Sequence, residues 1–448
     1  MQAPITIDTP VEFDDGLPES VDVTVIGAGV IGVFSALYLA RLGKRVLVCE
    51  KGRVAGEQSS RNWGWIRQHG RDEAELPITR QALQLWHEAD AETGGACGIK
   101  TVGISYLASS EKELARLLEW MDVAKRHDMD SYVLTQAQAN GLFQKPTGHP
   151  WLGGTCTPSD AKGEPWQAVP AVARLARAEG VLIRENCAVR HLHIEAGKVK
   201  GVVTEAGAVN SEQVVLCGGA WSSLFAQQMG ISLPQLSVEA TVAQTQPMEA
   251  GVSGSWVDEE LSMRRRDDGG YSLALADDHG YFISPDAFRH GLKFLPLLRK
   301  SWSDVQLAGI SRADYPDAWA VKRKWGANDV TPFERNRVLE PASSDRRVAK
   351  IRRRFAERFP SLGMPEIKHS WSGMIDAMPD VVPVVDQVAS VPGFYLATGM
   401  SAHGFGIGPG YGRIVARMLA GLSPEHDLQR FRWSRFSDGS KLVVGPSL

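Results

Sequence analysis

A glycine turn between a strand and a helix, within residues 21–50, limits most strongly what this chain can fold into. Residues 21–26 favour a strand that is buried on both faces of a sheet. The turn that follows at once reads Gly27-Ala28-Gly29-Val30-Ile31-Gly32. A helical pattern then covers residues 31–42, Gly43 offers a left-handed helix end, and residues 45–49 favour a second strand. The sequence therefore predicts a strand, a helix and a second strand of a parallel sheet.

Each part of this turn has a mechanical role in binding a dinucleotide. Gly27 permits the tight turn, Gly29 lets the backbone approach a pyrophosphate, and Gly32 lets the helix pack closely on the strand. The helix N-terminus offers unpaired N–H groups to the anion. Glu50 follows the second strand and is placed to accept hydrogen bonds from an adenosine ribose. The turn alone does not distinguish FAD from NAD, so an NAD(P)-only enzyme is an alternative at this point.

The composition allows two domain cores and excludes several kinds of partner. The chain has 448 residues, and its formal net charge of -3 gives no overall attraction to nucleic acid or to an acidic membrane. Residues 264–266 and 352–354 are arginine runs, which we expect to form solvated faces. The N-terminus resembles no secretory signal, and residues 21–40 fit a buried strand and helix better than a membrane helix. We therefore expect a cytoplasmic protein without a transmembrane segment or a nucleic-acid partner, and the oligomeric state stays open.

The cysteines predict neither a disulfide framework nor a metal site. They are odd in number and widely spaced, and they form no CxxC pair or Cys/His cluster. We expect reduced thiols and no bound metal. The cysteines are Cys49, Cys97, Cys156, Cys187 and Cys217.

Two more glycine-rich segments lie far from the first turn. Residues 181–222 alternate with the period of strands, turn at Ala196-Gly197 and Ala206-Gly207, and close on Gly218-Gly219-Ala220-Trp221. Residues 393–419 read as a strand, a glycine-rich loop over residues 399–410, and a helix. Pro409 is expected near the first position of that helix.

Together with the first turn, these segments resemble the D-amino-acid oxidase, glycine oxidase and sarcosine oxidase superfamily of FAD enzymes over nearly the whole chain. The resemblance implies an α/β fold. In it a Rossmann-type FAD-binding domain is interleaved with an α+β substrate domain built on a mixed or antiparallel sheet. The FAD-binding domain would comprise residues 1–90, 151–230 and 365–448, and the substrate domain residues 91–150 and 231–364. We expect substrate-domain strands at residues 236–246, 271–276, 281–285 and 291–295, and an outer helix at residues 111–126.

The same resemblance implies which segments contact FAD. Val189 would contact adenosine, and Gly218 to Trp221 would pass behind the pyrophosphate. The C-terminal glycine loop would lie along the isoalloxazine ring, with its helix N-terminus stabilising negative charge on the flavin. Residues 59–67 would form a loop over the pyrophosphate and flavin, although Trp63 or Trp65 could instead be ordinary core. The implied FAD-binding residues are Gly27, Ala28, Gly29, Val30, Ile31, Gly32, Glu50, Lys51, Ser59, Ser60, Arg61, Asn62, Trp63, Gly64, Val189, Gly218, Gly219, Trp221, Gly373, Met374, Ser401, His403, Gly404, Phe405, Gly406 and Ile407.

Arg67 is implied on the substrate side. It resembles the arginine of sarcosine oxidases that holds the substrate carboxylate, and arginine suits such a bidentate contact. The alternative is a salt bridge to Asp72, Glu73 or Glu75. Arg67 is therefore predicted to orient an acidic group of the substrate.

Three further residues complete the predicted catalytic set. Lys293, within Gly-Leu-Lys, resembles the lysine on a strand that activates oxygen near flavin N5, and an exposed strand edge is the alternative. Tyr281 or Tyr271 would line the pocket, with core packing as the alternative. His403 lies in the glycine loop, where we expect a positioning role because that loop acts mainly through its backbone.

Two departures from the resemblance affect the chemistry. Gly373 stands about where sarcosine oxidases carry a cysteine joined to the flavin, so we expect FAD to be noncovalent. The second carboxylate-binding lysine of those enzymes falls on Gly406, and the arginine of glycine oxidase falls at or near Ile375. The carboxylate clamp is therefore incomplete, which makes an amino-acid substrate less secure than amine oxidation.

The predicted activity is FAD-dependent oxidation of the C–N bond of an amino acid or of a primary or secondary amine. A hydride would pass to flavin N5, water would hydrolyse the imine, and O2 would be the acceptor. One alternative is a dehydrogenase that uses a quinone or a carrier protein, or an enzyme that oxidises a 2-hydroxy acid. A protein that binds flavin without catalysis is the other alternative.

Overall fold

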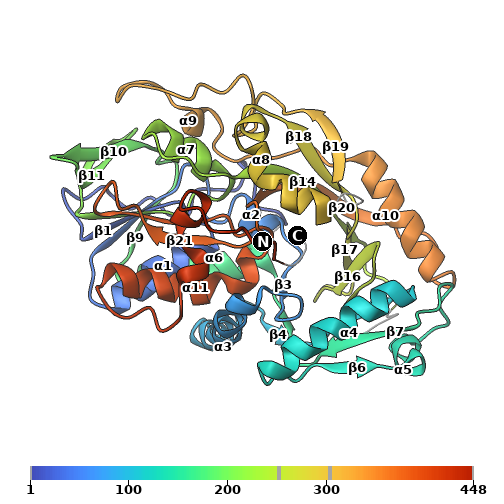
Figure 1. The fold of residues 1–448 in the computed structure, drawn as a ribbon. Helices are drawn as coiled ribbons and strands as arrows, with labels where there is room; N and C mark the ends of the chain where they lie inside the picture. The colour runs from blue at the N-terminus through green and yellow to red at the C-terminus, as the bar shows by residue number, and fades with distance from the viewer. Residues whose placement is uncertain (1–2, 250–253, 301–304, 446–448) are drawn as a thin grey trace.

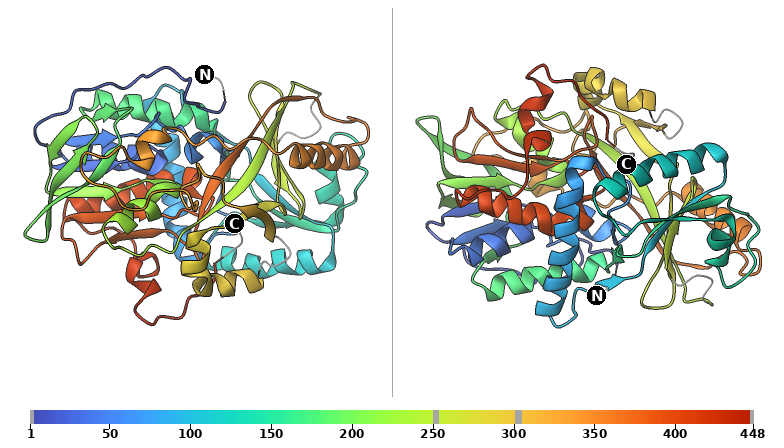
Figure 2. Two further views of the ribbon diagram at one scale, coloured as in Figure 1. Left: turned by 90° about the horizontal axis from the view of Figure 1, so that it is seen from above. Right: turned by 60° about the horizontal axis from the view of Figure 1, so that its bottom comes forward.

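The described residues form two large β-sheets that lie side by side (Figure 1). The structure is a computed structural model, and it describes residues 3–249, 254–300 and 305–445. Segments near the two ends of the chain lie together in one half of the molecule, whereas α4 (Glu111–Arg126) and α10 (Asp345–Arg358) lie in the other half (Figure 2). The chain therefore passes between the two halves several times.

One half is built on strands in the order β21-β22-β13-β1-β2-β9, called the parallel sheet below. The strands are β1 (Val23–Ile26), β2 (Val46–Cys49), β9 (Leu182–Arg184), β13 (Gln213–Leu216), β21 (Val384–Gln387) and β22 (Phe394–Thr398). β1 pairs in parallel with β2 and β13, and β21 joins β22 as an antiparallel edge. Every residue of β1 and β2 is buried, which explains why both sequences are almost continuously apolar. The predicted strand–helix–strand unit of a parallel sheet is confirmed.

Two helices far apart in the sequence pack on one another beside this sheet: α1 (Val30–Arg41) and α11 (Gly404–Leu419) (Figure 1). A Cβ atom at Gly412 would lie 2.5 Å from Cβ of Phe34, so glycine is needed at this crossing. Gly43 follows α1 in the expected left-handed conformation, with φ of +78°. Because α11 begins at Gly404, Pro409 lies inside the helix rather than near its first position, which corrects the prediction.

A small antiparallel sheet extends from the parallel sheet and contains β10 (Val189–Glu195), β11 (Lys198–Thr204) and β12 (Gly207–Asn210). Its first turn is at Ala196-Gly197, where both residues have positive φ, and its second precedes Gly207. The strands and both turns expected for this segment are confirmed.

The other half is built on a mixed sheet in the order β19-β18-β14-β17-β16-β15-β5-β7-β6, with β20 paired to β14. Most neighbours are antiparallel, but β15 runs parallel to β5 and β18 runs parallel to β19. The strands are β5 (Ile104–Ala108), β6 (Tyr132–Leu134), β7 (Gly153–Thr157), β14 (Leu236–Thr245), β15 (Ser255–Val257), β16 (Leu261–Arg265), β17 (Tyr271–Leu275), β18 (His279–Ile283), β19 (Val305–Ile310) and β20 (Ile367–Ala377). The predicted fold class, a Rossmann-type α/β part interleaved with a part built on a mixed sheet, is confirmed.

Two details of the expected organisation are corrected. Residues 291–295 lie in helix α8 (Pro285–Lys300) and not in a strand. Phe294 and Leu297 of this helix are buried while Leu292 and Leu295 are exposed, so a short apolar run concealed a helical period. β7 and β20 pair within the mixed sheet, which disagrees with the boundaries expected at residues 151 and 365.

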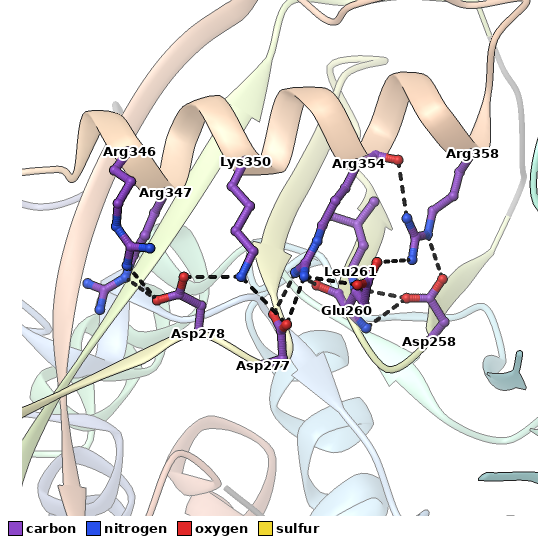
Figure 3. A network of polar contacts seen from close by, with 10 residues as sticks. All are labelled: Asp258, Glu260, Leu261, Asp277, Asp278, Arg346, Arg347, Lys350, Arg354 and Arg358. Atoms are coloured by element: carbon purple, nitrogen blue, oxygen red, sulfur yellow. Dashed lines mark hydrogen bonds and ion pairs between the residues drawn. The ribbon is translucent and has the colours of Figure 1, made fainter. Parts of the chain in front are cut away.

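The arginine runs are not solvated faces. In the first run, Arg264 is buried and pairs with the buried Glu164 at 2.8 Å. In the second run, Arg353 is exposed, but Arg354 is buried and pairs with Asp277. Side chains from α10 thus form a row of ion pairs with turns of the mixed sheet, from Arg346 and Arg347 to Arg358 (Figure 3).

Among the described residues, no helix has both the length and the apolar composition that crossing a bilayer requires. All five cysteines are buried and free.

Candidate cofactor and substrate site

A cavity lies at the carboxyl edge of the parallel sheet, where open α/β sheets bind their ligands. Residues at or just beyond the ends of four strands line it: Gly27 after β1, Glu50 after β2, Gly218 after β13 and Thr398 in β22. Its empty space, including solvent at its mouth, is about 1850 Å³. The cavity wall therefore combines segments from both ends and from the middle of the chain.

The first glycine turn has the geometry that a dinucleotide turn needs. Gly27 has φ of +102°, and a Cβ atom there would lie 2.6 Å from the carbonyl oxygen of Cys217. A Cβ atom at Gly32 would lie 2.0 Å from the carbonyl oxygen of Gly27. Gly29 lines the cavity at the N-terminus of α1, and a Cβ atom there would meet only Ser59 Oγ, at 3.1 Å. The turn therefore presents a helix N-terminus to the cavity.

Glu50 holds this turn together at the end of β2. Its carboxylate accepts hydrogen bonds from the N–H groups of Ala28 and Gly52, both at 2.8 Å. Burial raises the pKa of Glu50 above its ordinary value. Glu50 lines the cavity, whereas Ala28 only contributes the N–H group that fixes the carboxylate.

The loop expected over the pyrophosphate begins as the short helix α2 (Gln58–Arg61). Ser59, Arg61, Asn62 and Trp63 of this loop line the cavity, and Ser59 Oγ accepts a hydrogen bond from the Val30 N–H at 2.9 Å. Trp65 also lines it and forms an edge-to-face pair with Trp63, with ring centroids 5.3 Å apart. Both tryptophans therefore line the cavity, and Trp63 also packs against the hydrophobic core.

Two residues without a recognisable motif join three segments of the cavity wall. Asp376 on β20 accepts hydrogen bonds from the N–H groups of Gly399 and Met400, at 2.9 and 3.1 Å. It also accepts one from Gln58 Nε2 at 3.0 Å, and Gln58 Oε1 accepts the Ala220 N–H at 2.9 Å. Asp376 and Gln58 both line the cavity. They hold the loop after β22 and the segment after β13 in register with the loop at residue 58.

The end of the cavity near Val189 is closed by polar and aromatic side chains. Lys51 Nζ lies 4.5 Å from the ring centroid of Trp221, whose indole N–H donates to Glu57 at 2.9 Å. Arg337 lines the same end and forms an ion pair with Glu205. The sequence gives no motif for Arg337, because it lies in a segment without regular periodicity between α9 (Pro332–Arg335) and α10.

Arg67 lines the cavity with a second arginine, Arg71, which sequence reasoning missed. Arg67 Nη1 donates to the His69 carbonyl at 3.2 Å and to the Tyr106 hydroxyl. Within the part of the chain that the structure describes, Arg67 forms no ion pair. Two of the acids considered as alternative partners of Arg67 form ion pairs with other residues: Asp72 pairs with Arg430, and Glu73 pairs with Arg126.

His403 does not face the cavity. Its side chain is buried, its Nδ1 lies 3.9 Å from Glu75 Oε2, and burial holds its pKa well below the ordinary value. The preceding residues Ser401 and Ala402 both have positive φ. Glu75 is also fully buried, and this raises its pKa to about 7.

Lys293 and Tyr281 also lie outside the cavity wall. Lys293 is half-buried on α8, and its ammonium group donates to the Phe436 carbonyl. The prediction that Lys293 lies on a strand, on which its role in oxygen activation was based, is therefore wrong. Tyr281 is half-buried on β18, while His279 of the same strand lines the cavity. Tyr271 is buried in the core of the mixed sheet.

Most of the predicted FAD-binding residues line this one cavity. The predicted residues that do not line it are Ala28, Gly32, Ser60, Gly64, Ser401, His403 and Ile407. Several of these act behind the wall: the Ser60 hydroxyl accepts the Ile5 N–H, and Ser401 accepts the Met378 N–H. The glycine turn, the helix N-terminus and the continuation to Gly373 and the start of α11 fit an elongated dinucleotide such as FAD.

Comparisons with known proteins indicate the same cofactor as the shape of this cavity. A family model described as FAD dependent oxidoreductase matches residues 22–418. Mitochondrial sarcosine dehydrogenase of Mus musculus is 24% identical over 429 residues, which cover 94% of this chain and 42% of that protein. The beta subunit of sarcosine oxidase from Arthrobacter sp is 24% identical over 432 residues, which cover 94% of this chain and 93% of that protein.

A solved structure is similar over the whole fold. L-amino acid deaminase from Proteus myxofaciens, in complex with anthranilate, has a TM-score of 0.90 at 27% identity, and the match covers 98% of each chain. The chain spans less than half the length of the mouse sarcosine dehydrogenase that it resembles. The match over residues 22–418 and the cavity built by three distant glycine segments lead to one conclusion: this chain belongs to the family of FAD dependent oxidoreductases.

Proposed function

We propose that this flavoprotein oxidises the C–N bond of an amino acid or an amine to an imine, which water then hydrolyses. One observation carries the proposal: the cavity that starts at the glycine turn also contains Arg67 and Arg71, so a single space joins a dinucleotide site to two cations. Bound FAD supplies the acceptor for the hydride of the substrate carbon. The protein supplies binding, orientation and electrostatics.

The chain's own residues divide this work along the cavity. The N-terminus of α1 and Gly29 would bind the pyrophosphate, and Glu50 would accept hydrogen bonds from the ribose. The N-terminus of α11 would stabilise negative charge at the flavin end. Arg67, fixed by Tyr106 and the His69 carbonyl, would orient an acidic group of the substrate. A strong base is not needed when the amine arrives unprotonated.

The relatives support the same chemistry. Sarcosine and L-amino acids, which the names of these relatives contain, each carry an amine next to a carboxylate. Anthranilate, which is bound in the deaminase structure, also carries an amine and a carboxylate. A wall with two arginines suits a substrate of that kind.

The electron acceptor is proposed more broadly than the sequence suggested. The sequence favours oxygen through Lys293, but that side chain lies on α8 and donates to the Phe436 carbonyl, and neither residue lines the cavity. The proposal therefore includes a quinone or a carrier protein beside oxygen. The FAD is proposed to be noncovalent, because Gly373, which the resemblance places about where sarcosine oxidases carry a cysteine joined to the flavin, lines the cavity.

A flavin-bleaching screen tests this function. The purified yellow protein is mixed without air with amino acids, simple amines and 2-hydroxy acids, and the loss of flavin absorbance is followed. We expect amino acids to bleach the flavin, and peroxide formation on readmission of air would identify oxygen as the acceptor. Slow reoxidation in air would favour a quinone or a carrier. Bleaching by 2-hydroxy acids alone would replace C–N by C–O oxidation, and bleaching by dithionite alone would favour a flavin-binding protein without this activity.

A further inference from the structure

Arg71 is a buried cation whose charge has no partner in the described part of the chain. The residue is 5% exposed and lies in the cavity wall with Arg67. Its Nε donates weakly to the Arg67 carbonyl at 3.4 Å, and its buried Nη1 has no hydrogen-bond partner there. Leaving a buried guanidinium unpaired is costly, so such a group calls for an anion.

The acids near Arg71 do not provide that anion. Glu75 and Asp160 both act on its charge, but neither lies within ion-pair distance of it in the described residues. Burial raises the pKa of each carboxyl to about 7, so near neutral pH each holds a proton for a large part of the time. Neither oxygen of Glu75 has a hydrogen-bond partner among the described residues, and Asp160 uses Oδ1 to accept the Gln68 N–H at 2.8 Å. The two guanidinium groups therefore face the cavity without compensation.

The charge of one arginine acts on the other. Burial, followed by the charge of Arg67, lowers the pKa of Arg71 to about 9. Two like charges are held side by side in a buried wall only when the fold fixes them. Arg67 is fixed by Tyr106 and by the His69 carbonyl, and the His69 ring stacks on Tyr106 at 3.8 Å and lies 4.0 Å from Trp120. Gly70, with φ of +68°, makes the turn that brings Arg71 back beside Arg67.

We propose that Arg71 and Arg67 together bind the substrate carboxylate, so that Arg71 supplies the second cation of the clamp. This cation comes from a different part of the fold than Gly406 and Ile375, the positions at which the clamp looked incomplete. Two guanidinium groups offer several N–H donors to one carboxylate, and a preformed pair loses little freedom on binding. The site would then discriminate against amines that lack an acid. The choice of substrate rests on the proposed function, whereas the binding of a carboxylate does not.

The test measures binding rather than turnover. The FAD-loaded protein is titrated with benzoate, and with benzamide as the uncharged match, while the flavin absorbance reports occupancy. We expect Arg71→Met to weaken benzoate about ten- to a hundredfold and to leave benzamide unchanged. Arg71→Lys keeps the charge but loses the fork, so we expect a smaller loss. Arg80→Met, on the exposed face of α3 (Leu76–Glu92), is the matched control and should bind both ligands like the parent protein.

A second readout separates recognition from a structural role. Because Arg71→Met removes an uncompensated buried charge, we expect the ligand-free variant to melt at the same or a higher temperature, while its benzoate-induced increase shrinks. Unchanged benzoate affinity in folded, yellow Arg71→Met and Arg71→Lys would overturn the inference. Equal weakening of benzoate and benzamide, or a large fall in the ligand-free melting temperature, would also overturn it. If benzoate binding depends on Arg71 but no amino acid bleaches the flavin, the inference stands and the proposed reaction falls.

Discussion

At the scale of single residues, Glu75 links the buried cluster beside the cavity to pH. The charged and titratable groups that act on it are Arg71, Asp72, His403, Tyr411 and Arg430. Burial outweighs the nearby arginines and raises the pKa of Glu75 from 4.5 to about 7. The folded protein therefore keeps a proton that the unfolded chain releases. Between pH 4.5 and about 7, the contribution of Glu75 to the stability of the fold therefore falls as the pH rises.

Glu75→Gln should remove this loss, because glutamine has nearly the same shape and stays neutral. At pH 8 we expect the variant to be more stable than the parent by up to about 3 kcal/mol, and at pH 4.5 we expect the two to agree. Asp160, with a pKa also raised to about 7, keeps part of the pH dependence in the variant. Thermal melting of the substrate-free protein between pH 4.5 and 8 measures the difference.

Glu73→Gln is the matched control for that measurement. Glu73 is exposed and pairs with Arg126 and His127, and these contacts lower its pKa. Neutralising Glu73 should therefore give no gain at pH 8. If Glu75→Gln instead melts below the parent at pH 8, the Glu75 carboxylate stabilises the fold as a counter-charge for Arg71, its pKa is not raised, and the interpretation of the cluster is wrong.

At the scale of elements, α10 is attached to the mixed sheet by charges rather than by apolar contacts alone. Arg347, Lys350, Arg354 and Arg358 recur every three or four residues and so share one helix face, as Figure 3 shows. Their partners in the turns between β15 and β16 and between β17 and β18 are Asp258, Glu260, Asp277 and Asp278. Arg347 also pairs with Glu239 on β14 at 2.8 Å. These ion pairs, together with the buried Ile351 and Phe355, explain how a helix with so many cations has a buried face.

Arg358→Met should be strongly destabilising. Arg358 Nε lies 2.6 Å from Asp258 Oδ2, and the side chains are 3% and 0% exposed. Removing the cation leaves a buried carboxylate that still accepts the backbone N–H groups of Glu260 and Leu261 and the Trp151 indole N–H, but has no counter-charge. This costs about 3–5 kcal/mol. Arg353→Met on the same helix removes an exposed pair with Glu357 and should cost less than about 1 kcal/mol. Equal melting temperatures for the two variants would contradict the assigned difference.

At the scale of the whole molecule, the features that could be predicted are those with local backbone demands. Gly27, Gly32 and Gly43 were predictable because a tight turn, a close helix contact and a left-handed helix end each require glycine. Side chains whose role depends on contacts with distant segments of the chain could not be predicted. Lys293 read as part of a strand because three neighbouring residues matched a pattern, but exposed and buried positions alternate there with a helical period. Arg71 carried no signal, since nothing in the local sequence shows that it has no ion-pair partner among the described residues.

The cavity wall is also a whole-molecule feature, because one carboxylate joins segments more than 300 residues apart. Asp376 receives N–H groups from Gly399 and Met400 and the amide of Gln58, which in turn accepts the Ala220 N–H. The side chain of an asparagine at position 376 has one oxygen acceptor and one NH2 donor in place of the two carboxylate oxygens. Its NH2 group would therefore face at least one of these N–H donors. Asp376→Asn should therefore loosen the three segments together. A noncovalent FAD can be removed and titrated back, which makes this loosening measurable.

We expect Asp376→Asn to bind FAD about tenfold more weakly than the parent, because one buried hydrogen bond is lost and a donor is left unpaired. The melting temperature should gain less from added FAD in the variant, since a ligand stabilises the folded state according to its affinity. Asp386→Asn on β21, whose carboxylate accepts the Trp433 N–H outside the cavity wall, should bind FAD like the parent. If both variants match the parent, FAD binding does not depend on this connection, and each segment of the wall is held by its own half of the fold.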